Sequence, residues 1–462
     1  MSRFSVSGRD CSSWRAQKHD DAVTDAQPPW RSRAVPRGKA SRLGQFGRLA
    51  GGIAGGMIAE GARRLADGER PRLREMLLTP GNFRKLADRL SHLRGAAMKL
   101  GQMISLDAGD MLPPELAEIM ATLRERAHHM PPAQLEQIIL REWGAEWRSH
   151  FKRFDAIPIA AASIGQVHRA TSRDGRELAI KFQYPGVRES IDSDVDNVST
   201  LLRVSGLLPR GLDLGPLLAE AKRQLHEEAD YVREGEQMAL FGRLLNDSPG
   251  LLVPERIEAL SSERVLAMTF LEGAPIEGLV SASQAVRDTV AGALIALVVR
   301  ELFEFGVMQT DPNFANYRYQ AATGHLVLLD FGATRPVAPS TVAAYRAMLR
   351  AGLAGDRDAL REAALAAGIV GEATVAFQQA GIDEMIDIII AEMTRPGAFD
   401  FGDRRFVAVL RDRGMDVAAD QRAWHVPPAD ILFTQRKISG TALLAARLKA
   451  RVDVRSLVAP YI

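Results

Sequence analysis

Separate stretches of the chain carry residues that could handle a phosphorylated ligand. The segment LAIK places Lys181 on a predicted strand, where its ammonium group could neutralise phosphate oxygens. QTDPNFANY supplies Asp311 and Asn316, and VLLDFG supplies Asp330 at the end of an apolar run. Carboxylate and carboxamide oxygens are the ligands that Mg²⁺ prefers. These residues therefore predict a site where Mg²⁺ and phosphate groups meet.

The order of these motifs is the order found in protein kinases. Asp311 and Asn316 have the D-x-x-x-x-N spacing of a kinase catalytic loop, in which Asp accepts the acceptor's proton and Asn binds Mg²⁺. Asp330 begins the DFG motif that follows and would be the second metal ligand. Each motif is weak evidence when taken alone. For LAIK, for example, an exposed lysine on a strand is the more common explanation. Together they predict an ATP-binding, kinase-like domain.

A predicted helix from 217 to 245 offers a partner for Lys181. At 100 degrees per residue, Glu227, Asp230 and Glu234 fall on one narrow stripe of such a helix. A solvated acidic face is the usual cause of such a stripe. Because kinases pair the strand lysine with a helical glutamate, we expect Glu234 to orient Lys181.

The predicted nucleotide loop contains alanine where kinases usually have glycine. Ala160, Ala161, Ala162 and Ser163 precede the strand of Lys181. Alanine keeps the backbone amides that could bind phosphates, but its Cβ restricts φ and limits close approach. We expect nucleotide to bind in an altered pose, with Met268 on the adenine side of the site.

Other positions depart from typical protein kinases. Gln309 and Thr310 stand where His and Arg normally precede the catalytic Asp, and no A-P-E triplet follows the DFG motif. The missing triplet argues against protein substrates. A second DFG, at 400 to 402, follows no apolar strand or catalytic loop, and we interpret it as a coincidental match.

Composition narrows the class of protein. The 462 residues are 46% hydrophobic and carry a net charge of +2, which gives no field that would favour nucleic acid. Cys11 has no possible partner in the chain, which favours a reducing compartment. The longest apolar runs are shorter than the roughly 20 residues that cross a bilayer. Contact with a membrane surface stays open.

We expect a disordered leader followed by three structural regions. Their predicted bounds are residues 1 to 42 for the leader, 43 to 150 for a helical extension, 151 to 275 for an N-lobe and 276 to 462 for a C-lobe. The extension begins with a Gly-rich helix that could approach a lipid surface or simply pack within the chain. The expected fold class is α+β, a bilobal kinase-like fold with this helical extension.

The helix RGAAMKLGQMISLD identifies the family that the chain resembles. Lys99, Gly101 and Gln102 match the K-x-G-Q signature of the UbiB or aarF-domain (ABC1-type) atypical kinases, and Glu228 and Asp230 match the family's E-x-D motif. The alanine loop and the run KFQYPGV are further marks of the family. QTDPNFANY and the Gly-rich helix resemble the branch that supports coenzyme Q (ubiquinone) biosynthesis, in which the missing His and Arg are expected.

The resemblance implies Mg-ATP binding, ATPase activity and work with prenyl-quinone intermediates or ubiquinone biosynthesis proteins. It also implies peripheral contact with the inner membrane, from the cytoplasm or the mitochondrial matrix, and a homodimer is possible. The K-x-G-Q helix would lie across the site, so that Lys99, Gly101, Gln102, Glu228 and Asp230 regulate turnover. An ordinary helix with an exposed lysine is the alternative for K-x-G-Q. Alternative functions are a nucleotide-gated scaffold without turnover and a small-molecule phosphotransferase.

Overall fold

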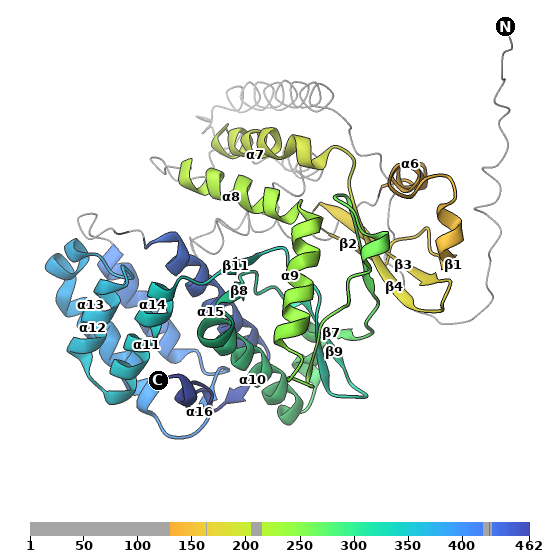
Figure 1. The fold of residues 1–462 in the computed structure, drawn as a ribbon. Coiled ribbons are helices and arrows are strands. Elements are labelled where there is room, and N and C mark those ends of the chain that lie inside the picture. Colours follow the sequence, from red (N-terminus) through yellow and green to blue (C-terminus); the bar gives the residue numbers. More distant parts are fainter. Residues whose placement is uncertain (1–129, 163, 205–214, 419–424, 426) are drawn as a thin grey trace, which may run out of the picture.

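The computed structural model describes residues 130–162, 164–204, 215–418, 425 and 427–462. Its helices and strands form a sheet-rich part and a helical part (Figure 1). The strands are β1 (Phe151–Phe154), β2 (Ala160–Ala161), β3 (Gly165–Ser172), β4 (Glu177–Gln183), β5 (Leu251–Leu252), β6 (Val265–Thr269), β7 (Ala274–Pro275), β8 (Val307–Gln309), β9 (Tyr317–Gln320), β10 (His325–Leu328), β11 (Thr334–Pro336), β12 (Phe399–Asp400) and β13 (Arg451–Val452). The helices are α6 (Pro132–Trp143), α7 (Val187–Val204), α8 (Gly215–Glu228), α9 (Tyr231–Leu244), α10 (Gln284–Arg300), α11 (Pro339–Ala354), α12 (Arg357–Ala366), α13 (Glu372–Thr394), α14 (Arg405–Ala418), α15 (Ala429–Arg447) and α16 (Val454–Val458).

The larger sheet positions Lys181 through the alternation of side chains along β4. The strand order is β1-β3-β4-β6, with β2 added to β3, and all neighbours are antiparallel. Leu178, Ile180 and Phe182 are fully buried in a core shared with α6. Because successive side chains point to opposite faces of a strand, Ala179 and Lys181 face the other side. Both line a cleft there.

The single helix expected from 217 to 245 is wrong, because the chain breaks between α8 and α9. Asp230 has φ −98° and ψ 84°, outside the helical range, and its carboxylate accepts a hydrogen bond from the amide of Arg233. Asp is a favoured residue at this capping position because its side chain satisfies an unpaired amide of the first turn. The break turns α9 away from α8, so the two helices present their acids to different partners.

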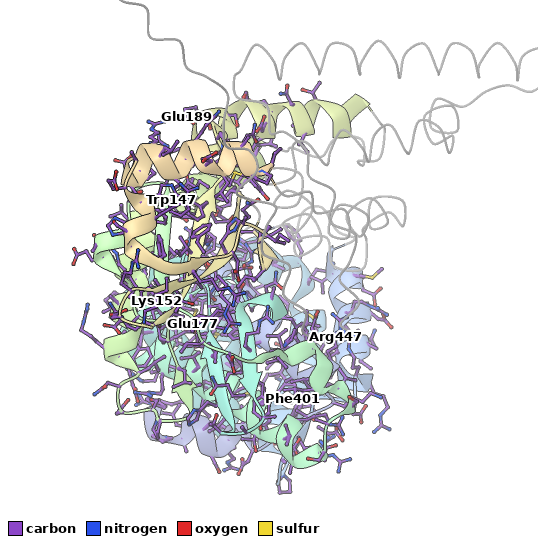
Figure 2. All side chains as sticks on the ribbon, turned by 90° about the vertical axis from the view of Figure 1, so that its right-hand side faces the viewer. Trp147, Lys152, Glu177, Glu189, Phe401 and Arg447 are labelled. Atoms are coloured by element: carbon purple, nitrogen blue, oxygen red, sulfur yellow. The ribbon has the colours of Figure 1, made fainter. Side chains whose placement is uncertain are left out.

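The helical part is centred on α10 and α15, which pack against each other and share a hydrophobic core with α9. Two short β-ladders lie beside them: β9 pairs with β10, and β8 pairs with β11. Helices α11 to α13 surround a smaller core of their own. Figure 2 shows Trp147 and Glu177 in the sheet-rich part and Phe401 in the helical part. Within the described ranges, no helix is both long and apolar enough to cross a membrane.

Candidate functional site

A cleft with a volume of about 680 Å³ lies between the larger sheet and the loops of the helical part. Its walls include strands β2, β4 and β6, the segment that precedes β9 and the segment that follows β10. The structure brings together most of the residues predicted from sequence. Those that line the cleft are Ala160, Ala161, Ala162, Lys181, Glu228, Glu234, Met268, Asp311, Asn316 and Asp330.

Lys181 and Glu234 form a buried ion pair at the centre of the cleft. The Lys181 ammonium donates to both carboxylate oxygens of Glu234 at 2.9 Å and lies 3.8 Å from Asp330. It also lies over the ring of Tyr231 at 5.0 Å. Glu227 and Asp230, predicted on the same stripe, have other partners: Glu227 bonds Arg335, and the Asp230 side chain caps α9. Glu234 alone among the three is therefore the lysine's partner.

Burial sets the charge balance of this pair. Burial acts to lower the pKa of Lys181, but Glu234 and Asp330 hold it well above its usual value. Burial raises the pKa of Glu234 to about 7, although Lys181 acts in the opposite direction. Lys181 thus stays positive at neutral pH, and Glu234 titrates near neutrality.

The DFG segment delivers Asp330 to the cleft. Phe331 is 2% exposed and packs against Phe241 of α9, with ring centroids 5.1 Å apart. The Asp330 carboxylate accepts a hydrogen bond from the amide of Gly332 at 3.0 Å. With Phe331 anchored in the core, the preceding carboxylate is left on the cleft side.

Asp311 and Asn316 lie close together in the loop between β8 and β9. The side-chain amide of Asn316 donates to the backbone oxygen of Asp311 at 2.9 Å and to its carboxylate at 3.3 Å. The nitrogen of the Asn316 carboxamide is therefore occupied, which leaves its carbonyl oxygen for a cation. Asp330, Asn316 and Asp311 are all oxygen donors in one cleft. They fit Mg²⁺, which takes one or two carboxylates together with waters and phosphate oxygens.

The alanine loop is a hairpin whose amides are partly occupied. Ala160 pairs with Val167 and Ala161 with Gln166 in the β2–β3 ladder. The amide of Ala162 donates to the oxygen of Gly165 at 2.8 Å. Ala162 therefore lines the cleft without a free amide for phosphate, which the sequence did not indicate. Ser163 lies outside the described residues.

Met268, on β6, lies in the wall of the cleft. It is 6% exposed and pairs with Ala179 across β4 and β6. The following Thr269 accepts a hydrogen bond through its hydroxyl from the amide of Glu255. The Thr269 side chain thus fastens β6 to the segment before it.

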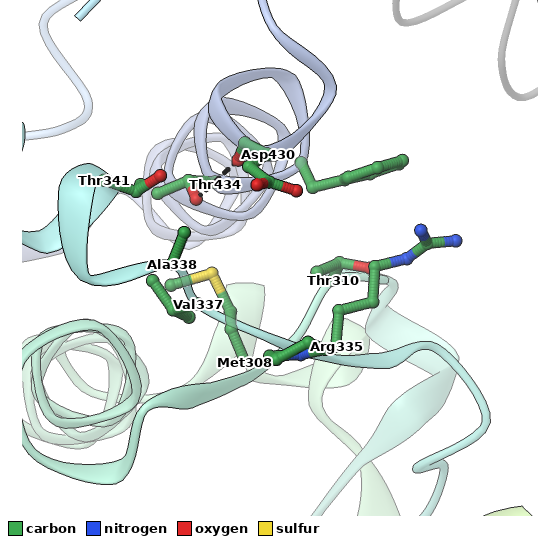
Figure 3. A pocket seen from close by; sticks show the side chains of 10 residues that line it. Met308, Thr310, Arg335, Val337, Ala338, Thr341, Asp430 and Thr434 are labelled. Carbon is green, nitrogen blue, oxygen red and sulfur yellow. Dashed lines mark hydrogen bonds between the residues drawn. The ribbon is translucent and has the colours of Figure 1, made fainter.

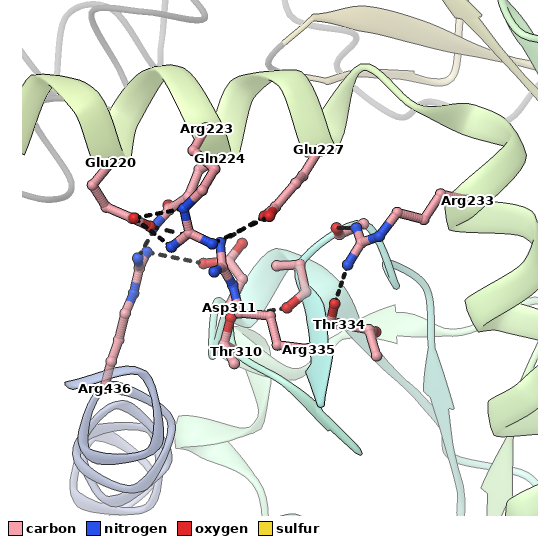
Figure 4. A network of polar contacts seen from close by, with 12 residues as sticks. Glu220, Arg223, Gln224, Glu227, Arg233, Thr310, Asp311, Thr334, Arg335 and Arg436 are labelled. Atoms are coloured by element: carbon pink, nitrogen blue, oxygen red, sulfur yellow. Dashed lines mark hydrogen bonds and ion pairs between the residues drawn. The ribbon is translucent and has the colours of Figure 1, made fainter. Parts of the chain in front are cut away.

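An arginine network beside the cleft was not predicted from sequence. Arg335 bonds Glu227 at 2.6 Å, and Arg436 of α15 lies 3.7 Å from the Asp311 carboxylate (Figure 4). Arg233 donates to the backbone oxygens of Gly332, the last residue of the DFG motif, and of Thr334. These residues belong to no sequence motif used above. Their partners are more than 90 positions away in the chain, so no local sequence pattern could indicate these contacts.

The remaining predicted residues have different positions relative to this site. Asp400 of the second DFG is bonded to Arg451 at 3.1 Å and does not line the cleft. Asp230 caps α9, whereas Glu228 lies in the cleft wall. Lys99, Gly101 and Gln102 lie outside the described residues.

The two-part fold and this cleft define a kinase-like protein. A family model, the ABC1 atypical kinase-like domain, matches residues 122–364. The chain belongs to this family. This match confirms the family resemblance inferred from the K-x-G-Q and E-x-D motifs. The relatives described next confirm the coenzyme Q biosynthesis branch, which was inferred from QTDPNFANY and the Gly-rich helix.

Similar proteins cover most of the chain. The chain is 36% identical over 445 residues to "Atypical kinase COQ8, mitochondrial" of Saccharomyces cerevisiae, covering 96% of this chain and 87% of that protein. It is also 36% identical to "Atypical kinase COQ8B, mitochondrial" of Rattus norvegicus, over 92% of this chain and 81% of that protein. The structure of the Mycobacterium tuberculosis protein Rv3197 with erythromycin superposes with a TM-score of 0.60 at 25% identity, covering 82% and 95% of the two chains. The kinase-like fold expected from sequence is confirmed.

Proposed function

We propose that this protein binds Mg-ATP in the cleft, hydrolyses it or transfers its phosphoryl group, and thereby supports ubiquinone biosynthesis. The observation that carries the proposal is the Lys181–Glu234 ion pair, at 2.9 Å, within the same cleft as Asp311, Asn316 and Asp330. Protein kinases need this lysine–glutamate pair and the DFG carboxylate in place for phosphoryl transfer.

Each residue has a distinct proposed role. Lys181 neutralises the phosphates, and Glu234 holds its ammonium in position. Asp311 positions water or accepts the proton of an acceptor, and Asn316 and Asp330 hold Mg²⁺. The ion would neutralise phosphate charge when it is bound.

The other predicted residues have supporting roles. Ala160 to Ala162 and Met268 enclose the nucleotide. Glu228 and Asp230, together with the K-x-G-Q residues, regulate turnover.

The biological setting rests on the relatives. The yeast and rat proteins are named mitochondrial. We infer that this chain works on membrane-bound prenyl-quinone precursors or with the enzymes that process them. A peripheral position at an inner membrane accounts for contact with such apolar substrates.

Phosphate release from Mg-ATP tests the proposal. The purified protein is assayed with and without anionic liposomes, beside an Asp330→Asn variant of equal thermal stability. If liposomes raise the turnover of the wild-type protein and Asp330→Asn has no turnover, the result supports an ATPase that acts at a membrane. Turnover that Asp330→Asn retains in full contradicts the assignment of this site.

Nucleotide binding without turnover in any condition would favour the scaffold function instead. In that case the Kd for ATP should still depend on Mg²⁺ and on Lys181. Transfer of phosphate to a soluble small molecule would favour the phosphotransferase.

A further inference from the structure

Helix α15 lies directly against the segment that leads into Asp311. Figure 3 shows Thr434 of α15 facing Met308 and Thr310 of that segment. The space left between them is a pocket of about 20 Å³, room for roughly one water molecule. The helix and the catalytic loop therefore meet without a layer between them.

A buried ion pair joins α15 to the end of α10. The Lys437 ammonium lies 3.2 Å from the Glu301 carboxylate, and the two residues are 1% and 0% exposed. Glu301 begins a π-helical turn, Glu301–Phe305, a feature often found at functional sites. Burying two charges is costly, and apolar residues of similar size are often neutral or stabilising replacements. Stability alone therefore does not account for this pair.

Hydrogen bonds continue from the pair to the catalytic loop. The amide of Gln309 donates to Glu301, and Lys437 approaches the side-chain oxygen of Gln309 at 3.4 Å. That same oxygen accepts a hydrogen bond from the amide of Asp311 at 3.2 Å. Lys437 also lies 3.5 Å from the hydroxyl of Tyr317, at the far end of the loop. The ion pair thus contacts both ends of the loop that carries Asp311 and Asn316.

Two further contacts come from the same face of α15. A Cβ on Gly440 would lie 2.1 Å from the Pro312 ring, so the loop rests on bare helix backbone there. Arg436 faces the Asp311 carboxylate at 3.7 Å. Positions 436, 437 and 440 share one helical face, because residues three and four apart are neighbours on a helix.

We propose that Lys437 is a positioning residue for phosphoryl transfer. It acts through Gln309, which stands where protein kinases carry His, and holds the backbone of Asp311 against α15. The inference rests on the proposed function, since Asp311 must act in turnover. It adds a component that the cleft motifs do not contain.

The test compares variants that cut this connection at different points. Gln309→Met removes the link and leaves the ion pair intact, whereas Lys437→Met combined with Glu301→Gln removes both charges together. We expect each to lower kcat for Mg-ATP hydrolysis roughly 10- to 100-fold, as small displacements of catalytic groups do. At saturating Mg²⁺ the Kd for ATP should change less than about twofold, because Lys181 and Met268 are untouched.

Combination with Asp311→Asn separates positioning from a general loss of structure. If Lys437 acts through Asp311, Gln309→Met should add little to the loss already caused by Asp311→Asn. Leu360→Ala, a buried truncation in the separate core of α11 to α13, serves as the control at a matched fall in Tm. The proposal would be overturned by an unchanged kcat, by a loss that multiplies with that of Asp311→Asn, or by an equal loss in Leu360→Ala.

A second readout distinguishes failure of this inference from failure of the proposed function. If the wild-type protein does not hydrolyse ATP, the proposed turnover is wrong, and the Mg²⁺ dependence of ATP binding decides the role of Lys437. Asn316 is bonded to Asp311, so a displaced loop should raise the Mg²⁺ concentration needed for binding. An unchanged Mg²⁺ requirement in Gln309→Met would contradict the inference.

Discussion

The Lys181 ammonium donates hydrogen bonds to both carboxylate oxygens of Glu234, at 2.9 Å each. The two residues come from β4 and α9, 53 positions apart in the chain. The contact ties the larger sheet to α9. It also fixes the direction in which Lys181 can extend into the cleft.

Replacing Lys181 by Ala should weaken binding of Mg-ATP by roughly 10- to 100-fold, the effect of losing a charge-assisted hydrogen bond to phosphate. Isothermal titration calorimetry measures the change. Lys152→Ala is the matched control, because Lys152 is an exposed lysine of the same sheet that lies outside the cleft. Equal affinity in Lys181→Ala and wild type would show that the phosphates bind elsewhere.

The activity should depend on pH through Glu234. Its pKa is raised to about 7, so kcat/KM for Mg-ATP should rise as pH increases through about 7 and Glu234 gains its charge. A Glu234→Gln variant should lack this rise and have lower activity above pH 7. A pH profile of the variant that still rises there would assign the titration to another group.

Stability should change with pH in the opposite direction. The folded pKa of Glu234 lies above its ordinary value of 4.5, so the folded state binds the extra proton between pH 4.5 and about 7. This group's contribution to stability is present below pH 4.5 and is lost as pH rises through about 7. The difference in Tm between Glu234→Gln and wild type should therefore shift in favour of the variant over that range, and a constant difference would contradict the assignment.

The two DFG motifs should respond differently to the same substitution. Asp330→Asn should abolish the Mg²⁺ dependence of ATP binding, because Asp330 lies in the cleft 3.8 Å from Lys181. Asp400→Asn should leave it unchanged, since Asp400 bonds Arg451 outside the cleft. Titration of a fluorescent ATP analogue with and without Mg²⁺ measures both. The reverse pattern would show that the wrong motif has been assigned to the metal.

Adding a methyl group to Gly440 should displace the catalytic loop. The new Cβ of Gly440→Ala would lie 2.1 Å from Pro312, far below van der Waals contact, so turnover should fall at least about tenfold. Gly292→Ala is the matched control on α10, because its Cβ would meet Val452 at an ordinary 3.8 Å. That change should raise stability by up to about 1 kcal/mol and leave turnover intact. Similar activity in both variants would argue against the α15 contact.

The amino-acid sequence by itself determined the motifs, the family and the two-part fold. Lys181, Asp311, Asn316 and Asp330 occur in motifs of fixed spacing, and such local patterns are readable because the residues within each motif act together. The pairing of Lys181 with Glu234 also followed from the kinase order of elements. The alternation along β4 placed the lysine on the cleft side for the same reason, since the period of a strand is fixed.

Only the tertiary structure decided which basic residue each acidic side chain of α8 and α9 contacts, and which residues hold the loop of Asp311. The break at Asp230 sent Glu227 to Arg335 rather than to Lys181, which the helical stripe did not predict. The hairpin occupied the amide of Ala162, and α15 placed Lys437 beside Glu301. Lys437 and Glu301 are more than 130 positions apart in the chain, so their contact depends on how α10 and α15 pack and no local pattern encodes it.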